Sequence, residues 1–214
     1  MVLKKISILI IFFCGINLSV FSQKTTIYTN KDAIYQSGLA LFEKEKYEAA
    51  QEKFATVLKN IDDDKSEIAV NSMYYKAICG LKLFNIDAEA LLTTFIFTYP
   101  ESPKVKLIYF YLGEYKFRKR KYKEVLAWFS KIDIYDLSND EIAEYQFKKG
   151  YSYFMEKKYA EASKAFFEIK DTDNKYTSAA RYYYAHIAYL QKKYESSLLT
   201  FQSLNKKSKF APLV

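Results

Sequence analysis

The sequence predicts an all-α protein, a helix-turn-helix solenoid of about five helix pairs in a right-handed superhelix. Three observations predict this fold class. The 214 residues include only 5 glycines and 3 prolines, so long helices with short turns are expected. A Lys-Tyr pair recurs along the chain, and apolar residues follow each tyrosine at helical intervals. A tiny residue nine positions before each tyrosine marks a second helix. Outside residues 1–30 we expect about 85–95% helix.

Residues 1–22 have the pattern of a signal peptide. Two lysines precede an apolar stretch, residues 6–16, which is shorter than the roughly 20 residues that a membrane-spanning helix needs. Small residues before Gln23 predict cleavage there. We therefore expect an exported protein, periplasmic or associated with the outer membrane, with a linker at 23–30. The alternatives are an uncleaved anchor or a lipid on Cys14.

Four tyrosines, Tyr47, Tyr122, Tyr159 and Tyr194, begin the same apolar pattern. The residues 3, 7 and 10 positions after them share one face of a helix. These are Ala50, Phe54 and Val57, then Val125, Phe129 and Ile132, then Ala162, Phe166 and Ile169, and finally Ser197, Phe201 and Leu204. The four phenylalanines on this stripe are expected in the core.

One repeat lacks the tyrosine. Between residues 74 and 100, Ala88, Leu92 and Phe95 reproduce the stripe, with Asn85 in the place of the tyrosine. The small residues that mark the preceding helices are Gly38, Gly113, Gly150 and Ala185. A glycine within a helix costs about 0.5–1 kcal/mol relative to alanine, so its recurrence predicts close helix packing. The expected units are about 31–62, 64–100, 103–136, 139–173 and 176–208, and 209–214 is expected to begin a further, truncated repeat.

Helix starts are also predicted. Asp64-Lys65-Ser66-Glu67 and Ser138-Asn139-Asp140-Glu141 read as capping boxes. Ser102-Pro103 reads as a cap followed by a proline in the first turn.

The repeated unit resembles the tetratricopeptide repeat, whose signature is a small residue, an aromatic, an alanine and a second aromatic. Gly150, Tyr153, Tyr159, Ala162 and Phe166 match this signature in one unit. The resemblance covers about residues 31–208 and implies a helical solenoid that binds other proteins. The sequence departs from the family where Gln146 and Lys149 replace large apolar residues. The family pattern therefore does not predict how that helix packs.

The junction Tyr99-Pro100-Glu101-Ser102-Pro103 in an exported chain looks like bacterial envelope members of this family. These include the periplasmic coordinator of the Tol-Pal system and the outer-membrane assembly lipoprotein of the β-barrel machinery. Such proteins are adaptors. The resemblance implies an adaptor role in the cell envelope.

The charge does not indicate a nucleic-acid partner. The formal net charge is +8, with 33 Lys+Arg and 25 Asp+Glu, and these residues are spread along the helical patterns. The densest basic run, residues 118–121, falls in an expected turn between two helices. We expect a solvated turn, with contact to an anionic lipid or polymer as the alternative.

The groups that catalysis requires are scarce. The single histidine, His186, has no second histidine or cysteine at metal-ligand spacing. Neither a phosphate-binding glycine loop nor a nucleophile elbow is present. Asp62-Asp63-Asp64 lacks the spaced acids of a calcium loop and fits a solvated turn before a helix. Cys79 lies in an apolar run and is expected to be buried. We therefore expect no enzyme, no cofactor and no metal.

Two classes of function remain. The first is an exported scaffold or adaptor that binds a polypeptide in the cell envelope, with peripheral association with the outer membrane or an envelope complex. The alternative is a structural spacer or assembly module that forms the N-terminal part of a longer envelope repeat protein.

A ligand-binding face is predicted on the concave side, built by the first helix of each pair. Positions three before, one after and four after each small residue share one helical face. The candidate residues at these positions are Tyr35, Phe42, Phe110, Glu114, Phe117, Phe147, Tyr151, Phe154, Tyr182, His186 and Tyr189. They would form an apolar groove for an extended or helical segment with large side chains. The alternative is that Phe147 and Phe154 pack between helices.

Overall fold

The structure, a computed structural model, describes residues 25–204. This part of the chain is all-helical, as predicted, with 74% helix and no strand. The helix content is below the expected range because several second helices of the pairs are only eight or nine residues long. The signal peptide at 1–22 and the further repeat at 209–214 lie outside the described residues.

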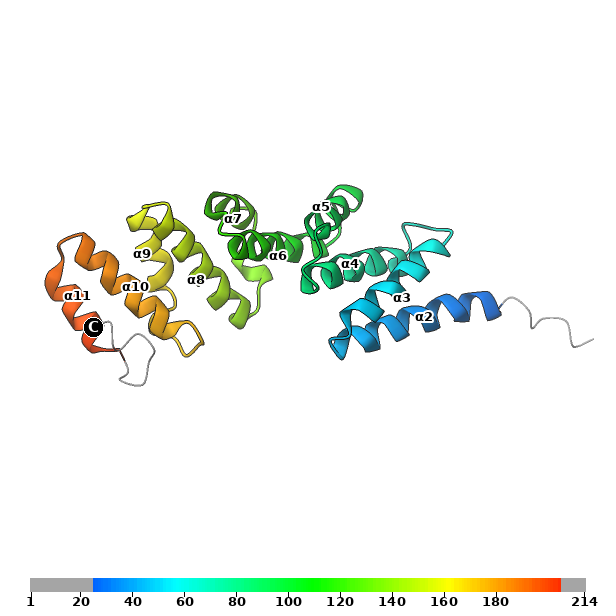
Figure 1. The fold of residues 1–214 in the computed structure, drawn as a ribbon, viewed down its shortest axis with the longest axis horizontal. Coiled ribbons are helices and arrows are strands. Elements are labelled where there is room, and N and C mark those ends of the chain that lie inside the picture. Colours follow the sequence, from blue (N-terminus) through cyan, green and yellow to red (C-terminus); the bar gives the residue numbers. More distant parts are fainter. Residues whose placement is uncertain (1–24, 205–214) are drawn as a thin grey trace, which may run out of the picture. The chain divides into compact units, whose positions relative to one another are not determined.

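The chain divides into two compact units, residues 1–88 and 89–214. Unit 1 contains α2 (Thr25–Glu43), α3 (Tyr47–Lys59) and α4 (Glu67–Lys82), which pack side by side (Figure 1). Helix α2 begins at Thr25, so residues 25–30 of the expected linker are helical. Those residues contain neither glycine nor proline, the residues that most readily interrupt a helix.

Unit 2 contains the remaining helices. Helix α5 (Ala88–Thr98) begins at the boundary, and α6 (Lys104–Arg118) pairs with α7 (Tyr122–Phe129). A short 3-10 turn, η1 (Ile134–Asp136), leads to α8 (Asn139–Met155), which pairs with α9 (Tyr159–Phe167). Helices α10 (Thr177–Leu190) and α11 (Tyr194–Gln202) form the last described pair (Figure 1). The first helix of each pair is the longer one.

The predicted stripe forms the core. Phe54, Phe129 and Phe166 are 0–1% exposed. Ala88, Leu92 and Phe95 are also fully buried, which confirms the stripe that lacks a tyrosine. The prediction for Phe201 was wrong, because its side chain is only half-buried. The other phenylalanines are covered by the first helix of the next pair, and α11 is the last helix among residues 25–204.

The glycines of the first helices lie against these phenylalanines. A Cβ atom added at Gly38, Gly113 or Gly150 would lie 2.8, 2.1 or 2.9 Å from a ring carbon of the phenylalanine in the partner helix. Carbon atoms in contact are normally at least 3.4 Å apart. The small residue therefore permits close helix approach, as the sequence analysis expected.

The turns inside the pairs share one backbone geometry. Five residues, each following a first helix, have positive φ angles of 56–61°: Glu45, Phe84, Arg120, Lys157 and Lys192. Each is flanked by the two backbone hydrogen bonds of a Schellman motif, such as Lys157 N to Phe154 O at 3.0 Å and Lys158 N to Tyr153 O at 2.9 Å. Residues 119–121 form one of these turns, and Arg118, which was predicted to belong to the turn, is the last residue of α6.

The turn before α5 is shifted by one residue. Elsewhere the left-handed residue lies two positions before the tyrosine, whereas Phe84 lies one position before Asn85. Ile86, which therefore takes the place of the tyrosine relative to the turn, is exposed. Asn85 instead donates a 3.3 Å hydrogen bond from Nδ2 to Oε1 of Gln51.

Replacing Lys157, whose φ is 59°, by glycine is expected to stabilise the protein. An L-residue pays a steric cost at positive φ that glycine avoids. Lys157→Gly should raise the free energy of unfolding by about 0.5–1 kcal/mol, measured by urea unfolding. Lys158→Gly is the matched control, because Lys158 has a φ of −88° and should gain nothing. Equal effects of the two substitutions would contradict the explanation.

The predicted caps are largely present, with two shifts. Ser138 and Glu141 form the capping box of α8. At α4 the cap is Ser66, whose Oγ accepts from Ala69 N, rather than Asp64. At α6 the cap position is Pro103 itself. Asp63 holds the preceding turn by accepting from Lys65 N at 2.9 Å, which agrees with a turn feeding a helix.

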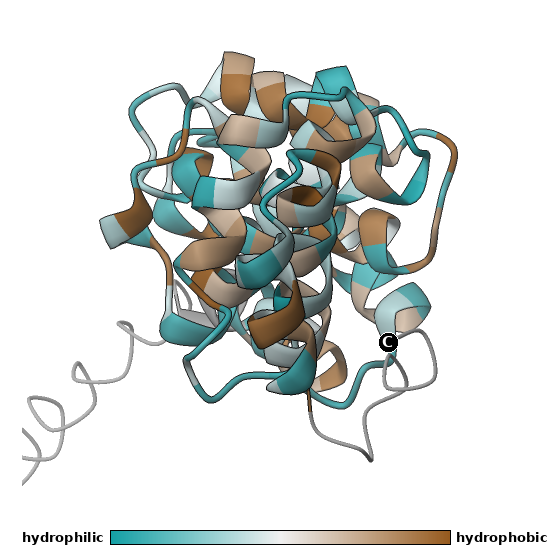
Figure 2. Cartoon of the chain, turned by 90° about the vertical axis from the view of Figure 1, so that its left-hand side faces the viewer, coloured by the Kyte–Doolittle hydropathy of each residue, from teal (hydrophilic) through white to brown (hydrophobic). Residues whose placement is uncertain are grey.

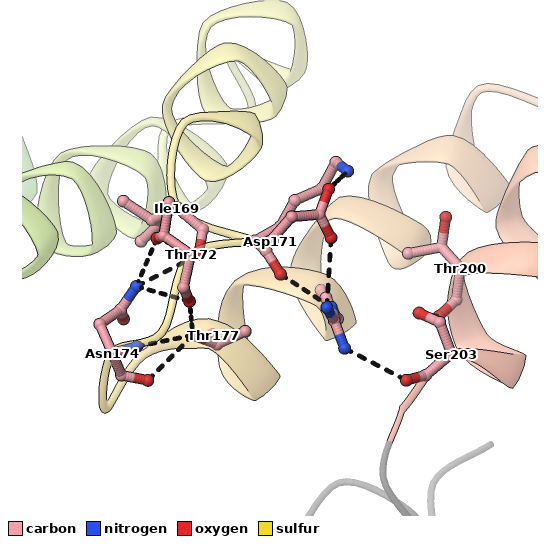
Figure 3. Close-up of polar contacts among 9 residues, drawn as sticks. Ile169, Asp171, Thr172, Asn174, Thr177, Thr200 and Ser203 are labelled. Carbon is pink, nitrogen blue, oxygen red and sulfur yellow. Dashed lines mark hydrogen bonds and ion pairs between the residues drawn. The ribbon is translucent and has the colours of Figure 1, made fainter.

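The long connection between α9 and α10 is ordered by side-chain hydrogen bonds (Figure 3). Asn174 Nδ2 donates to Ile169 O at 3.3 Å and to Thr172 Oγ1 at 2.8 Å. Asn174 N donates to Thr177 Oγ1 at 3.2 Å. These contacts fix the start of α10.

The connections between the helices are mostly hydrophilic, whereas the helices alternate hydrophilic and hydrophobic segments (Figure 2). This is the pattern of helices with one buried face. None of the helices between residues 25 and 204 is both long and apolar enough to cross a membrane.

Candidate functional site

The structure separates the candidate face into buried and accessible residues. Tyr35 and Phe110 are buried. Each packs on the core phenylalanine of its own pair, with ring centres 6.0 Å apart for Tyr35 and Phe54 and 6.1 Å apart for Phe110 and Phe129. These two residues were predicted to face a ligand, but they support the fold.

The half-buried candidates form a ring network in each unit. In unit 1, Phe42 contacts Tyr47 and Tyr75 at 5.5 and 5.0 Å between ring centres. In unit 2, Phe117 contacts Tyr122 and Tyr151 at 6.0 and 5.6 Å.

Phe147 and Phe154 belong to the same network in unit 2. Phe147 stacks on Tyr176 with ring centres 4.8 Å apart, and Phe154 contacts Tyr183 at 5.3 Å. Both side chains keep some accessible surface. Both side chains thus pack against α10 and the connection before it and are only half-buried.

The last pair carries the most accessible candidates. Tyr182 and His186 are half-buried, with ring centres 6.0 Å apart. Tyr189 is 56% exposed and packs on Tyr194 at 5.7 Å.

A charged cluster lies among these rings on α6 and α8. Lys148 pairs with Glu114 of the preceding first helix and with Glu144, whose Oε1 is 2.5 Å from Lys148 Nζ. Glu144 Oε2 also accepts from Lys175 Nζ at 3.1 Å. The exposed fraction of the side chain is 12% for Lys148 and 21% for both Glu114 and Glu144. Partly buried ion pairs of this kind are screened less by salt than surface pairs.

The pKa values of the two carboxyl groups of the cluster, Glu114 and Glu144, are shifted in opposite directions. Burial and a hydrogen bond with Glu144 raise the pKa of Glu114, against the effect of Lys148. Burial also opposes the charged form of Glu144, but the hydrogen bonds from Glu114 and Lys148 outweigh it and lower the pKa of Glu144 to about 2. Glu144 is thus the group that stays ionised, and Glu114 is the one that takes up a proton first.

The sequence analysis named Glu114 but missed Glu144, Lys148 and Lys175. A signal was present, because Lys148 lies two residues before Gly150 and Tyr183 lies two residues before Ala185. The residue at this position points toward the preceding pair in both cases.

A buried lysine, Lys116, was also missed. Its Nζ lies 2.6 Å from Glu89 Oε1 and 2.5 Å from Glu124 Oε2. This ion triad joins α5, α6 and α7 within unit 2. The Lys116 side chain is only 5% exposed, so we assign the triad a role in the fold.

A second aromatic surface lies on α5 and α7, away from the predicted residues. A groove of about 510 Å³ is lined by Phe97, Pro100, Trp128 and Lys131, among others. Trp128 stacks on Tyr109 with ring centres 6.0 Å apart, and Lys131 Nζ lies 4.6 Å from the centre of the Trp128 ring.

Groups that could support chemistry are dispersed. Within residues 25–204, no three His, Cys, Asp or Glu side chains gather closely enough to hold a metal ion. Cys79 is a buried free thiol, as expected, and burial raises its pKa to about 12. Asp62 pairs with Lys31 at 3.0 Å.

Comparisons with known proteins concern the fold. No protein-family model matches the sequence, and no curated protein matches it. Several solved structures are similar. MamA of AMB-1 is 18% identical with a TM-score of 0.65, and the match covers 87% of this chain and 98% of that chain.

Two further structures differ more in sequence. PilF of Pseudomonas aeruginosa is 14% identical with a TM-score of 0.55, and the match covers 82% of this chain and 75% of that one. A Podospora anserina protein, described as a candidate kinesin light chain with nearly identical TPR-like repeats, is 11% identical with a TM-score of 0.58; the match covers 81% and 92%. The chain therefore has the tetratricopeptide-type helical repeat fold.

Proposed function

We propose that this protein is an exported scaffold that binds a polypeptide through the first helices of unit 2. The observation that carries the proposal is the row of aromatic side chains on α6, α8 and α10, which ends at the exposed Tyr189. Aromatic residues held by packed helices bind with little loss of side-chain freedom and often anchor protein interfaces. The similarity to tetratricopeptide-type structures supports a scaffold for protein partners.

The proposed location is the bacterial cell envelope, in the periplasm or peripherally at the outer membrane. The support comes from residues 1–22, which have a basic start, a short apolar stretch and a cleavage pattern. The concave side of the repeat array is the proposed binding side. The charged cluster around Lys148 would set the direction in which a bound segment lies, because charge complementarity fixes register.

We expect Tyr189→Ala to abolish capture of the partner from envelope extract while leaving the melting temperature unchanged. The reason is that Tyr189 is largely exposed, so truncation removes contact surface without opening the core. Tyr135→Ala is the matched control, because Tyr135 is 92% exposed on η1 and should retain the partner. Phe110→Ala should lower the melting temperature.

The proposal fails if Tyr189→Ala and Tyr135→Ala retain the same partner equally. It also fails if both lose it, because loss at a remote exposed tyrosine would indicate non-specific adhesion.

A second candidate function is a spacer or assembly module within a longer envelope repeat protein. The observation that favours it is the apolar surface of α11, where Leu198 and Leu199 are exposed. Terminal repeats usually carry a polar outer face. An assembly module would capture no separate partner through Tyr189, so the capture experiment distinguishes the two functions.

A further inference from the structure

A set of four rings in the fourth helix pair encloses a tyrosine of the next pair. Phe147, Tyr151 and Phe154 of α8 and Phe166 of α9 surround Tyr183 of α10, with ring centres 5.3–6.3 Å from the Tyr183 ring. We call such a set of three first-helix residues and one second-helix phenylalanine a ring socket. Burial, followed by the nearby Tyr151 hydroxyl, raises the pKa of Tyr183 to about 12.

In the first and third pairs, the side chain at the repeat position of Tyr183 also contacts the socket of the preceding pair. In the first pair, Phe42 and Phe54 contact Tyr75 of α4 with ring centres 5.0 and 5.4 Å apart. In the third pair the residue is Lys148, whose Nζ lies 5.8 Å from the centre of the Phe117 ring. Tyr75 lies two residues before Ala77, which is buried and lies seven residues before Phe84, as the other small residues lie seven before their positive-φ residues; Lys148 lies two residues before Gly150. The repeat therefore specifies which side chain covers a socket.

The last pair repeats the socket with nearly the same dimensions. Its members are Tyr182, His186 and Tyr189 of α10 and Phe201 of α11. The Tyr182 and Phe201 rings are 5.9 Å apart, the same distance as between their counterparts in the fourth pair. The contact of Tyr189 with Tyr194 is 5.7 Å, against 5.8 Å for its counterpart. The geometry of this socket is thus already formed.

Two members of the last socket, Phe201 and Tyr189, keep accessible surface. Phe201 is half-buried whereas its counterparts in three other pairs are completely buried, and Tyr189 is exposed whereas its counterparts Phe42, Phe117 and Phe154 are half-buried. No helix follows α11 within residues 25–204. In the first, third and fourth pairs a side chain of the next first helix contacts the equivalent rings.

The last pair is held in place independently of any covering helix. Arg181 Nε donates to Lys170 O at 2.7 Å, its Nη1 donates to Ser203 O at 3.3 Å, and its Nη2 pairs with Asp171 Oδ1 at 3.3 Å. These contacts tie the end of α11 to the connection before α10 (Figure 3). A preformed site loses less conformational freedom when it binds a partner.

We infer that the ring socket of α10 and α11 binds a helix of a partner protein through a tyrosine side chain. The internal sockets show the chemistry of the occupant, since Tyr75 and Tyr183 fill two of them. His186 replaces Tyr151 at the position next to the tyrosine hydroxyl, and its ring nitrogens offer a hydrogen-bond partner there. This inference rests on the proposed scaffold function and names the chemistry of its partner.

The test uses a fluorescent, helix-stabilised peptide with the sequence of residues 177–190, the helix that fills the fourth socket. Binding to the full chain is followed by fluorescence anisotropy. We expect saturable binding, and at least a roughly tenfold weaker affinity when the tyrosine of the peptide that corresponds to Tyr183 is replaced by alanine. Tyr189→Ala in the chain should weaken binding by a similar factor, and Tyr135→Ala should leave it unchanged.

Two results would overturn the inference. One is binding that does not depend on the peptide tyrosine or on Tyr189. The other is binding that occurs only in a Phe210→Ala chain, because the socket would then be occupied by residues 205–214 of the same chain. If the peptide binds as expected but no envelope protein is captured, the proposed function fails while the socket stands. If an envelope protein is captured through Tyr189 but the peptide does not bind, the socket inference fails while the proposed function stands.

Discussion

Phe129→Ala and Phe166→Ala should each lower the free energy of unfolding by about 3–5 kcal/mol, the usual cost of truncating a large buried side chain. Each ring fills the space between a glycine of its own pair and a tyrosine of the next. Phe129 lies 4.8 Å from Tyr145 between ring centres, and Phe166 lies 5.5 Å from Tyr183. Removing either ring opens a cavity at a contact between two pairs.

The measurement is urea unfolding followed by circular dichroism. Phe201→Ala is the internal comparison, because Phe201 occupies the same repeat position but is half-buried. Its loss should be clearly smaller. Equal losses for Phe166 and Phe201 would show that coverage by the next pair does not determine the contribution of the ring.

Glu144→Gln should lower the free energy of unfolding at pH 7 by at most about 3 kcal/mol, because the pKa of Glu144 is lowered from 4.5 to about 2 and each pKa unit corresponds to about 1.4 kcal/mol. The sign follows from linkage. A carboxyl group with a depressed folded-state pKa stabilises the fold above its unfolded pKa, and this contribution disappears as the pH falls from about 4.5 to about 2. The wild-type chain should lose this stability over that range, and the variant should not.

Glu114→Gln should not lower the free energy of unfolding at pH 7. The pKa of Glu114 is raised, so its ionised form costs the folded state stability above that pKa, and glutamine removes the cost. We expect an unchanged or higher free energy of unfolding at pH 7. Glu161→Gln, at an exposed site on α9, is the control. Losses of the same size for Glu114 and Glu144 would contradict the opposite pKa shifts.

Sequence periodicity was sufficient to predict the repeat and most of its core. Offsets from the tyrosines located Phe54, Phe129 and Phe166, because a buried stripe must follow the helical period. The same offsets could not distinguish Phe201, because its burial depends on what covers the pair rather than on its own helix. Helix caps were placed within one or two residues, which is the usual uncertainty of helix ends.

The candidate face was harder to predict. Residues three before and four after each small residue share a helical face, yet Tyr35 and Phe110 are buried while Tyr189 is exposed. The first two pack on the phenylalanine of their own second helix. A helical face shows which residues lie together, but it does not show which neighbour covers them. Lys148 was missed because the positions used did not include the one two residues before the small residue.

Trp128 provides a spectroscopic probe restricted to one unit. It is the only tryptophan in the chain, and it lies in unit 2 against Tyr109 and Lys131. Fluorescence excited selectively at tryptophan therefore reports on unit 2 alone, whereas far-ultraviolet circular dichroism reports on the helices of both units. The difference between the two unfolding midpoints directly measures whether the units unfold as one cooperative system or separately.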